Sequence, residues 1–174
     1  MAGSNPENRD WVLQKVLEIQ PKSIIDVGAG AGTYSQLLRK HLPDTKFIAV
    51  EIYGKNIEQY KLQEMYDEVI YADVRLLNSF AADLVIFGDV LEHMTQVEAI
   101  NVWDVARHSA KWGIISIPIV HYAQGEVDGN IHETHVVDDW SNLKVFACFE
   151  KITEAKIGEV TGAYLAKFGG KHGE

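Results

Sequence analysis

Residues 24–33 read Ile-Ile-Asp-Val-Gly-Ala-Gly-Ala-Gly-Thr, and this stretch decides the fold of the chain. A short apolar run ends in an acid, three glycines alternate with small residues, and an amphipathic segment follows at 34–41. This order predicts a buried strand, a tight turn and the start of a helix. Glycine lets the backbone approach a ligand where a Cβ would collide, and the first N–H groups of the helix face the same space. We therefore expect a nucleoside-containing cofactor to bind here.

Strands and helices alternate on both sides of this turn. Apolar residues recur at helical spacing over 11–19, and Pro21 ends that helix. The patterns then predict strands at Ser23–Val27, Lys46–Glu51, Glu68–Ala72, Leu84–Phe87 and Trp112–Ile117. They predict helices at Thr33–His41, Lys55–Met65 and Thr95–Ala110. Thr95, with Glu98 three residues later, is a candidate capping box. Such alternation is typical of a parallel sheet with right-handed crossovers.

The pattern changes after the last of these strands. Residues 119–137 show no period and predict a long loop, after which Asp138 or Asp139 can cap a helix that runs to Phe146. Phe149–Ile157 and Glu159–Phe168 face each other across Gly158 and predict a terminal hairpin.

Length and composition predict one globular domain over residues 1–174, with residues 1–9 as a loose arm. The net charge is −9 and basic residues do not cluster into a patch, so nucleic acid is a poor candidate partner. No apolar run has the length of a membrane span. The single cysteine excludes an internal disulfide and fits a cytoplasmic setting.

Two acids at strand ends extend the predicted cofactor site. Glu51 ends the second strand, where a carboxylate can accept both hydroxyls of a ribose. Asp73 follows the third strand and could accept the exocyclic amine of an adenine, with Val74 offering a backbone N–H and Ile52 packing on the ring. The alternative for both acids is a solvated strand end.

The fourth strand runs into Gly88-Asp89-Val90-Leu91-Glu92-His93, and at this point the chain resembles the class I S-adenosylmethionine-dependent methyltransferases. The resemblance covers about residues 11–120 and lies in a D-x-G-x-G-x-G first motif and a D-V-L-E-H segment. It implies a Rossmann-like fold: a mostly parallel seven-stranded sheet with an antiparallel C-terminal hairpin. It also implies S-adenosylmethionine as methyl donor, S-adenosylhomocysteine as product, and a cofactor site at Asp26, Gly28, Ala29, Gly30, Gly32, Glu51, Ile52, Asp73, Val74 and Asp89.

The resemblance also implies that Asp26 lies near the amino end of the cofactor. The activity that it implies is methyl transfer to an oxygen or nitrogen of a small molecule. Histidine is the side chain that suits a general base at neutral pH. His93, His132 and His135 are therefore the candidate catalytic residues, and His121 is a further loop histidine. The alternative for His93 is that it caps or packs beside the following helix.

The acceptor pocket is expected to form from about residues 1–20 and the 119–140 loop. Residues 112–143 contain five acids and no Lys or Arg, which favours a neutral or cationic acceptor. A second subunit could cover this open site, so a homodimer is one option. Five aromatic residues could line a pocket or belong to the core: Phe80, Trp103, Trp112, Tyr122 and Trp140.

Three alternative functions stay open. Asp89, Glu92 and His93, together with the segment His132–His135, could hold a divalent metal, as in metal-assisted methyltransferases that act on quinone precursors or RNA ends. The primary prediction includes no metal, because D-V-L-E-H also occurs in relatives without one. The second alternative is a nicotinamide-dependent oxidoreductase, whose glycine motif typically has a third glycine at the position of Thr33. A cofactor-binding module without catalysis is the third alternative.

Overall fold

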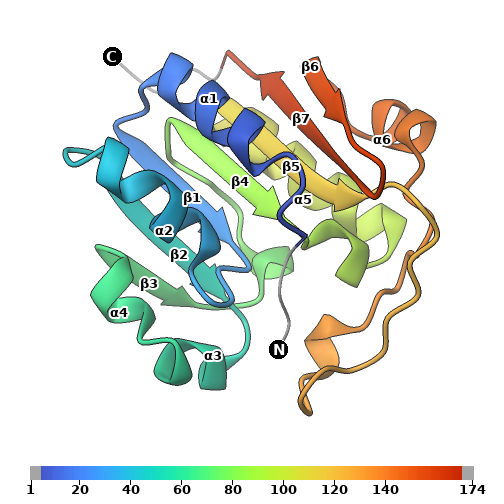
Figure 1. Cartoon of the computed structure of the whole chain (residues 1–174), viewed down its shortest axis with the longest axis horizontal. Coiled ribbons are helices and arrows are strands. Elements are labelled where there is room, and N and C mark those ends of the chain that lie inside the picture. The colour runs from blue at the N-terminus through green and yellow to red at the C-terminus, as the bar shows by residue number, and fades with distance from the viewer. Residues whose placement is uncertain (1–4, 170–174) are drawn as a thin grey trace.

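A seven-stranded sheet forms the centre of the computed structural model, which describes residues 5–169 (Figure 1). The strands lie in the order β3-β2-β1-β4-β5-β7-β6. Their bounds are Ser23–Val27 (β1), Lys46–Glu51 (β2), Glu68–Tyr71 (β3), Leu84–Gly88 (β4), Trp112–Pro118 (β5), Ile152–Ile157 (β6) and Thr161–Lys167 (β7). Every strand predicted from the sequence is present.

The first five strands are parallel, and the last two form the predicted hairpin. β7 pairs antiparallel with β5 on one side and β6 on the other, which confirms the mixed sheet. Because β2 and β4 lie on opposite sides of β1, the strand order reverses there. In open sheets of this kind a crevice forms at such a reversal, outside the carboxyl ends of the strands. The fold thus brings the glycine turn after β1 next to the segment after β4.

Helices cover both faces of the sheet, so side chains on both sides of the central strands are buried (Figure 1). On one face, Phe47 and Leu84 join a core with the first four helices, α1 (Arg9–Ile19), α2 (Thr33–Leu38), α3 (Gly54–Gln59) and α4 (Leu62–Met65). On the other face, Val85 and Phe87 join a core with α5 (Gln96–Ser109) and α6 (Asn142–Cys148).

Two predicted helices are wrong as single α-helices. The segment Lys55–Met65 divides into α3 and α4 because Lys61 adopts a left-handed conformation with φ 51°, which a continuous helix cannot contain. The segment Thr33–His41 forms α2 and then a 3-10 turn, η1 (Arg39–His41). In contrast, α5 begins as predicted: the Glu98 N–H donates to Thr95 Oγ1, and the Thr95 N–H donates to Glu98 Oε2.

The last helix begins later than the sequence predicts. Neither Asp138 nor Asp139 caps it; the hydroxyl of Ser141 accepts the hydrogen bond from the N–H of Lys144. Asp139 forms an ion pair with Nζ of the same lysine over 2.7 Å instead. The expected long loop precedes this helix and contains one 3-10 turn, η4 (Ile131–Glu133). Two further 3-10 turns follow β3 and β4, namely η2 (Val74–Leu76) and η3 (Leu91–His93).

The predicted N-terminal arm divides into a part outside the described residues, 1–4, and a docked part. Glu7 accepts hydrogen bonds from the backbone N–H groups of Glu159, Val160 and Thr161, at 2.6, 2.9 and 2.7 Å. Asn8 Nδ2 donates to the carbonyl of Thr161 over 2.8 Å. The arm is thereby fixed to the turn between β6 and β7.

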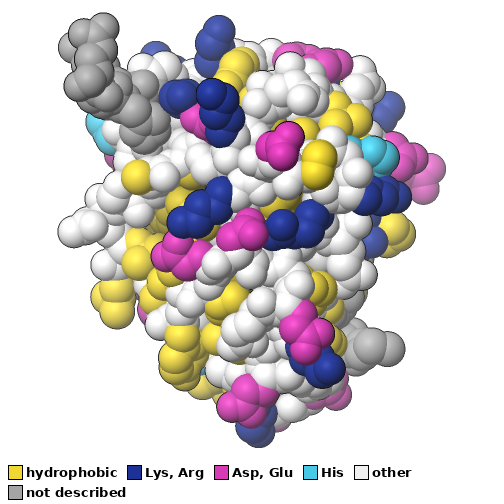
Figure 2. Space-filling model, turned by 90° about the vertical axis from the view of Figure 1, so that its left-hand side faces the viewer, with side chains coloured by type: hydrophobic (Ala, Val, Ile, Leu, Met, Phe, Trp, Pro, Cys, Tyr) yellow, Lys and Arg dark blue, Asp and Glu magenta, His cyan; other side chains and the backbone are white. Residues whose placement is uncertain are grey.

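The surface on the side of α2, α4 and β3 carries charges of both signs. Figure 2 shows Lys and Arg side chains interspersed with Asp and Glu over this face. Lys46 pairs with Glu68 at 2.7 Å and Arg39 with Asp67 at 3.0 Å. A face of paired charges is a weak binding surface for a phosphate backbone. None of the helices within residues 5–169 combines the length and the apolar character that crossing a membrane requires.

Candidate functional site: a two-part cavity at the β1–β4 crevice

The glycine turn adopts backbone conformations that explain its composition. Gly28, Gly30 and Gly32 all have positive φ, at 66°, 51° and 76°. A Cβ at Gly28 would lie 2.5 Å from Cγ2 of Val90, and one at Gly32 would lie 2.7 Å from Cε of Met65. A Cβ at Gly30 would meet only the carbonyl of Gly28, at 3.7 Å, and Gly30 lines the cavity. Gly32 therefore serves packing, Gly28 packs against Val90 while it also borders the cavity, and Gly30 leaves room for a ligand.

Glu51 is fixed against this turn at the end of β2. The side chain is buried, and its carboxylate accepts hydrogen bonds from the N–H of Gly30 and the N–H of Tyr53, both at 2.8 Å. The two bonds hold the carboxylate at the cavity wall and leave each oxygen with a further lone pair. The position and orientation suit the predicted ribose contact.

The half of the cavity beyond Glu51 is lined by the residues predicted to hold an adenine. Ile52, Asp73 and Val74 all border it. Both carboxylate oxygens of Asp73 accept hydrogen bonds from the guanidinium of Arg75, which lines the same wall and holds the pKa of Asp73 below its usual range. No sequence pattern singles out Arg75, which lies in an exposed 3-10 turn.

Asp26 lies buried under the glycine turn at the carboxyl half of β1. The hydroxyl of Tyr66 donates to its Oδ2. The pKa of Asp26 is raised to about 7, mainly by burial; the Tyr66 hydrogen bond opposes this rise, and the charge of Glu51 adds to it. Asp26 borders the other half of the cavity with Gly28, Ala29 and Gly30. A carboxyl with such a pKa gains most from a cationic ligand group, because the cation favours its ionised form.

The segment after β4 forms the wall between the two halves. Asp89 has a positive φ of 52°, and its N–H donates to the carbonyl of Ser116 on β5. A Cβ at Gly88 would lie 2.2 Å from the ring of Tyr34, so that position admits glycine only. Gly28, Gly30, Asp89, His93 and Glu133 border both halves of the cavity. The two halves are therefore parts of one crevice.

The second half is walled by several segments that lie far apart in the sequence, and it carries acids and histidines among neutral residues. The arm contributes Asn5, Pro6 and Arg9, and the long loop contributes Tyr122 and Gln124. Both segments are expected from the sequence as walls of the acceptor pocket, and both border this half. Its charged and titratable lining consists of one guanidinium, four carboxyls and two imidazoles, those of Arg9, Asp26, Asp89, Glu92, Glu133, His93 and His135.

Glu92 and His93 lie in η3 at the floor of this half. Glu92 is 1% exposed, and its two carboxylate oxygens have no hydrogen-bond partner among the described residues. Burial, and then the nearby Asp89, raises the pKa of Glu92 well above its usual value. Burial lowers the pKa of His93 to about 4, so its ring is neutral at physiological pH. His93 lies in η3 before the capped start of α5, so it does not cap that helix.

The structure brings together only two of the three histidines predicted to be catalytic. The rings of His93 and His135 lie 5.0 Å apart. The ring of His132 lies in the other half, edge-on to Tyr53 with centroids 6.5 Å apart. His121 is exposed, with Nδ1 at 3.7 Å from the carboxylate of Asp138. The loop thus directs neighbouring histidines to different halves of the cavity.

The aromatic residues that could have lined the pocket mostly belong to the core. Phe80, Trp103 and Trp140 are buried in the core under α5 and α6, and Trp112 packs against the opposite core. Tyr122 alone among these five borders the cavity. No sequence pattern singles out Tyr34, Tyr66 or Arg9, which lie in or next to ordinary helices.

Comparison with known proteins identifies the architecture. No family model matches the sequence, and no curated protein does. Among solved structures, human N-acetylserotonin methyltransferase in complex with S-adenosylmethionine matches with a TM-score of 0.69 and 15% identity, over 94% of this chain and 52% of that one. An S-adenosylmethionine-dependent methyltransferase from Clostridium acetobutylicum matches with a TM-score of 0.69 and 12% identity, over 93% of this chain and 91% of that one.

A third match is the N-terminal domain of EvdMO1, crystallised in the presence of S-adenosylhomocysteine and D-fucose. It has a TM-score of 0.68 and 13% identity, over 95% of this chain and 85% of that domain. The chain spans about half the length of the human enzyme and of two other matched structures, 52%, 55% and 53%. The sheet order, the antiparallel hairpin and these matches together show that the chain has the Rossmann-like fold of the class I methyltransferases.

Proposed function

We propose that this chain transfers a methyl group from S-adenosylmethionine to an oxygen or nitrogen of a neutral or cationic small molecule. The observation that carries the proposal is the shared wall of the crevice. Gly28, Gly30, Asp89 and His93 border both the half suited to a nucleoside and the half that the arm and long loop enclose. A cofactor that crossed this wall would present its sulfonium to the second half.

The residues of each half fit the parts of that cofactor. Glu51, Ile52, Asp73 and Val74 would hold the adenosine, with the Glu51 carboxylate at the ribose hydroxyls. Asp26 would face the amino end, where its ionised form pairs with an ammonium. The backbone at Gly30 would approach the methionine part because it carries no Cβ.

In this reaction the main task of the protein is to position the methyl donor and the acceptor. A lone pair on the acceptor forms a bond to the methyl carbon while the carbon–sulfur bond breaks. The electron pair stays on sulfur, which becomes a neutral thioether, and the acceptor proton leaves to water. Holding donor and acceptor in line and excluding other nucleophiles supplies most of the acceleration. For a hydroxyl acceptor, the ring of His135 borders the second half, where it could relay the leaving proton to water.

The charges of the second half support a neutral or cationic acceptor. Four carboxyl side chains and one guanidinium line it. An anionic acceptor would be repelled there. The small-molecule class is also supported by the solved structures, which include a methyltransferase named for N-acetylserotonin and a domain crystallised with D-fucose. The cytoplasmic location and the homodimer stay predictions from the sequence.

Calorimetric titration of the full chain with S-adenosylhomocysteine and, separately, with NAD tests the cofactor. We expect saturable binding of the first and none of the second; the reverse result would favour the oxidoreductase alternative. Transfer of a radiolabelled methyl group from S-adenosylmethionine to a panel of alcohols, phenols, amines and carboxylic acids then tests the reaction. Binding of the cofactor without transfer to any compound would favour a non-catalytic module.

A further inference from the structure

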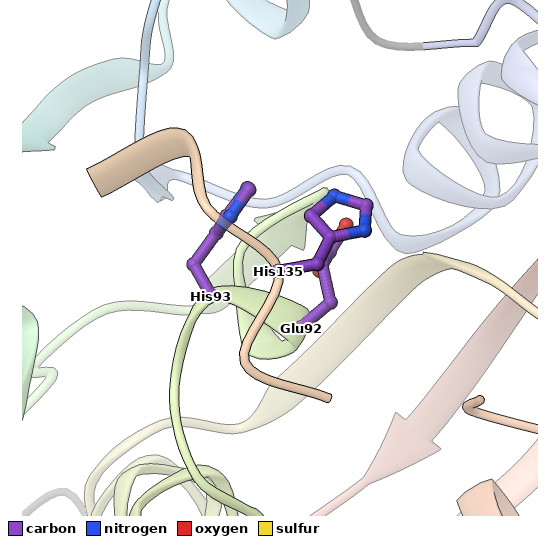
Figure 3. A group of neighbouring side chains, drawn as sticks. All are labelled: Glu92, His93 and His135. Atoms are coloured by element: carbon purple, nitrogen blue, oxygen red, sulfur yellow. The ribbon is translucent and has the colours of Figure 1, made fainter. Parts of the chain in front are cut away.

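Three potential metal ligands converge at the floor of the second half. One ligand atom from each of Glu92, His93 and His135 lies within 4.8 Å of the other two. Figure 3 shows Glu92 and His93 on the same short turn and His135 on the loop segment that passes over it. Ligand atoms bound to one ion at about 2.0–2.2 Å lie roughly 3–4 Å apart, so small side-chain rotations would close this group.

Glu92 is the observation that points to a bound cation. It is 1% exposed, and both carboxylate oxygens lack a hydrogen-bond partner among residues 5–169. Buried polar groups in native proteins nearly always have partners, because leaving one unpaired forfeits its hydration, and the loss is greater for a charged group. Within residues 5–169, no lysine or arginine side chain forms an ion pair with Glu92. A metal ion would satisfy both oxygens.

The two imidazoles are oriented as metal ligands usually are. His93 Nδ1 lies 3.2 Å from the carbonyl of Thr134, and His135 Nδ1 lies 2.6 Å from the carbonyl of Tyr122. A carbonyl only accepts, so each Nδ1–H donates and each Nε2 keeps its lone pair. An N–H bonded to a backbone carbonyl is the outer-shell arrangement that fixes the ring of a ligating histidine.

The backbone also fixes the loop over the turn. The N–H groups of Val136 and Val137 both donate to the carbonyl of Glu92, at 2.8 and 3.1 Å. The His135 N–H donates to the carbonyl of Gln124. The residue that follows His135 is therefore tied directly to the residue that supplies the carboxylate, which places the three ligands in one rigid unit.

We propose that Glu92, His93 and His135 bind one divalent transition-metal ion of the zinc type. Two imidazoles and one carboxylate form a donor set that catalytic zinc sites use, with coordination positions left for water or substrate. The set is narrower than the alternative drawn from the sequence, whose primary prediction included no metal: His132 lies in the other half of the crevice and is no ligand.

The chemical consequence rests on the proposed methyl transfer. The three residues border the half assigned to the acceptor, so the open positions would face it. An ion there would bind an acceptor hydroxyl and lower the pKa of its proton. The proton would pass to water, and the oxygen would then attack the methyl carbon as the carbon–sulfur bond breaks. The preferred acceptor class is therefore a hydroxyl compound rather than an amine.

Cobalt(II) titration of the EDTA-treated full chain tests the site by its visible absorption bands, independently of any reaction. We expect saturation at one ion per chain, and a 10- to 100-fold weaker affinity in Glu92→Gln and in His135→Ala. His132→Ala is the matched control, a histidine three residues away on the same loop, and should bind cobalt as the parent does. Thermal unfolding of each variant without metal verifies that it is folded.

The outcomes separate the two proposals. The metal site is overturned if no cobalt spectrum develops, or if Glu92→Gln and His135→Ala bind cobalt as tightly as the parent and His132→Ala do. Titration of the same EDTA-treated protein with S-adenosylhomocysteine tests the cofactor site alone. Cofactor binding without metal binding overturns only the metal site, and metal binding without cofactor binding overturns only the proposed function.

Discussion

The hydroxyl of Tyr66 donates a hydrogen bond to Oδ2 of Asp26 over 2.5 Å, and this bond joins the residue after α4 to the carboxyl half of β1. Both side chains are buried, with 5% and 2% exposure. The bond supports the ionised carboxylate, whereas burial raises its pKa to about 7. Asp26 is therefore poised between its two protonation states at physiological pH, directly beneath the glycine turn.

The affinity for S-adenosylhomocysteine should depend on pH through Asp26. The ammonium of the ligand favours the ionised carboxylate, so binding below pH 7 must first release a proton. We expect the association constant to fall about tenfold per pH unit below pH 7 and to level off above it. Calorimetry between pH 5.5 and 8.5 measures this profile. Asp26→Asn should bind more weakly at pH 8 and show no such slope.

The raised pKa of Asp26 also makes the free energy of unfolding depend on pH. A carboxyl whose pKa rises from 3.8 in the unfolded chain to about 7 in the folded one stabilises the fold fully below pH 3.8, and this contribution is lost as the pH rises through 7. Asp26→Asn removes that dependence. The variant should therefore gain stability relative to the parent between pH 4 and pH 8, as measured by urea unfolding. A constant difference across that range would contradict the assigned pKa.

Removing the Tyr66 hydroxyl should shift the binding profile without abolishing it. Tyr66→Phe leaves Asp26 buried and without this donor, which raises its pKa further. The midpoint of the affinity profile should move above pH 7, and the unfolding free energy should fall by about 1–3 kcal/mol. Tyr164→Phe is a control, because this hydroxyl lies on β7 and donates to Asn142 Oδ1 in α6, away from Asp26.

Gly30→Ala should weaken cofactor binding while it leaves the fold in place. The added Cβ meets only the carbonyl of Gly28 at 3.7 Å within the protein, but it enters the space proposed for the methionine part. We expect roughly a 30- to 100-fold loss of affinity, equivalent to about 2–3 kcal/mol. Gly169→Ala is the matched control, since Gly169 also has a positive φ, 72° against 51° for Gly30, and its surroundings are open. Equal affinities for both variants would contradict the role given to Gly30.

The arm should be held by Glu7 in a pH-dependent manner. Three backbone N–H groups lower the pKa of Glu7 from 4.5 to about 2. A lowered carboxyl pKa stabilises the folded form above pH 4.5, and the contribution is lost as the pH falls through about 2. Glu7→Gln should lower the melting temperature at pH 7, with a difference from the parent that shrinks below pH 4.5. The exposed Glu58 provides the control, Glu58→Gln.

The same variant tests whether the arm shapes the acceptor half. Asn5, Pro6 and Arg9 line that half only because Glu7 and Asn8 fix the arm to the β6–β7 turn. Glu7→Gln should therefore raise the KM for the acceptor, once one is known, more than it weakens S-adenosylhomocysteine binding. An equal loss of both would indicate a general destabilisation.

Much of the fold was predictable because its signals are local. The uninterrupted apolar runs of β1 and β4 predict strands that are covered on both faces, and both strands are buried. The glycines after β1 predict a turn with positive φ, and all three have it. The capping box at Thr95 needs only residues three apart. The helix break at Lys61 was missed because a lysine gives no signal for positive φ, and the cap at Ser141 because Asp138, Asp139 and Ser141 are all residue types that favour an N-cap.

By itself the sequence determined the order of strands and helices and the crevice edge at which Glu51 and Asp73 lie, since periodicity and turn chemistry act within a few residues. Only the tertiary structure decided that Tyr66 supports Asp26, that Glu7 fastens the arm, and that His135 rather than His132 meets Glu92. These contacts join segments far apart in the chain. Their partners are selected by burial and by the closure of long loops, which no local pattern records.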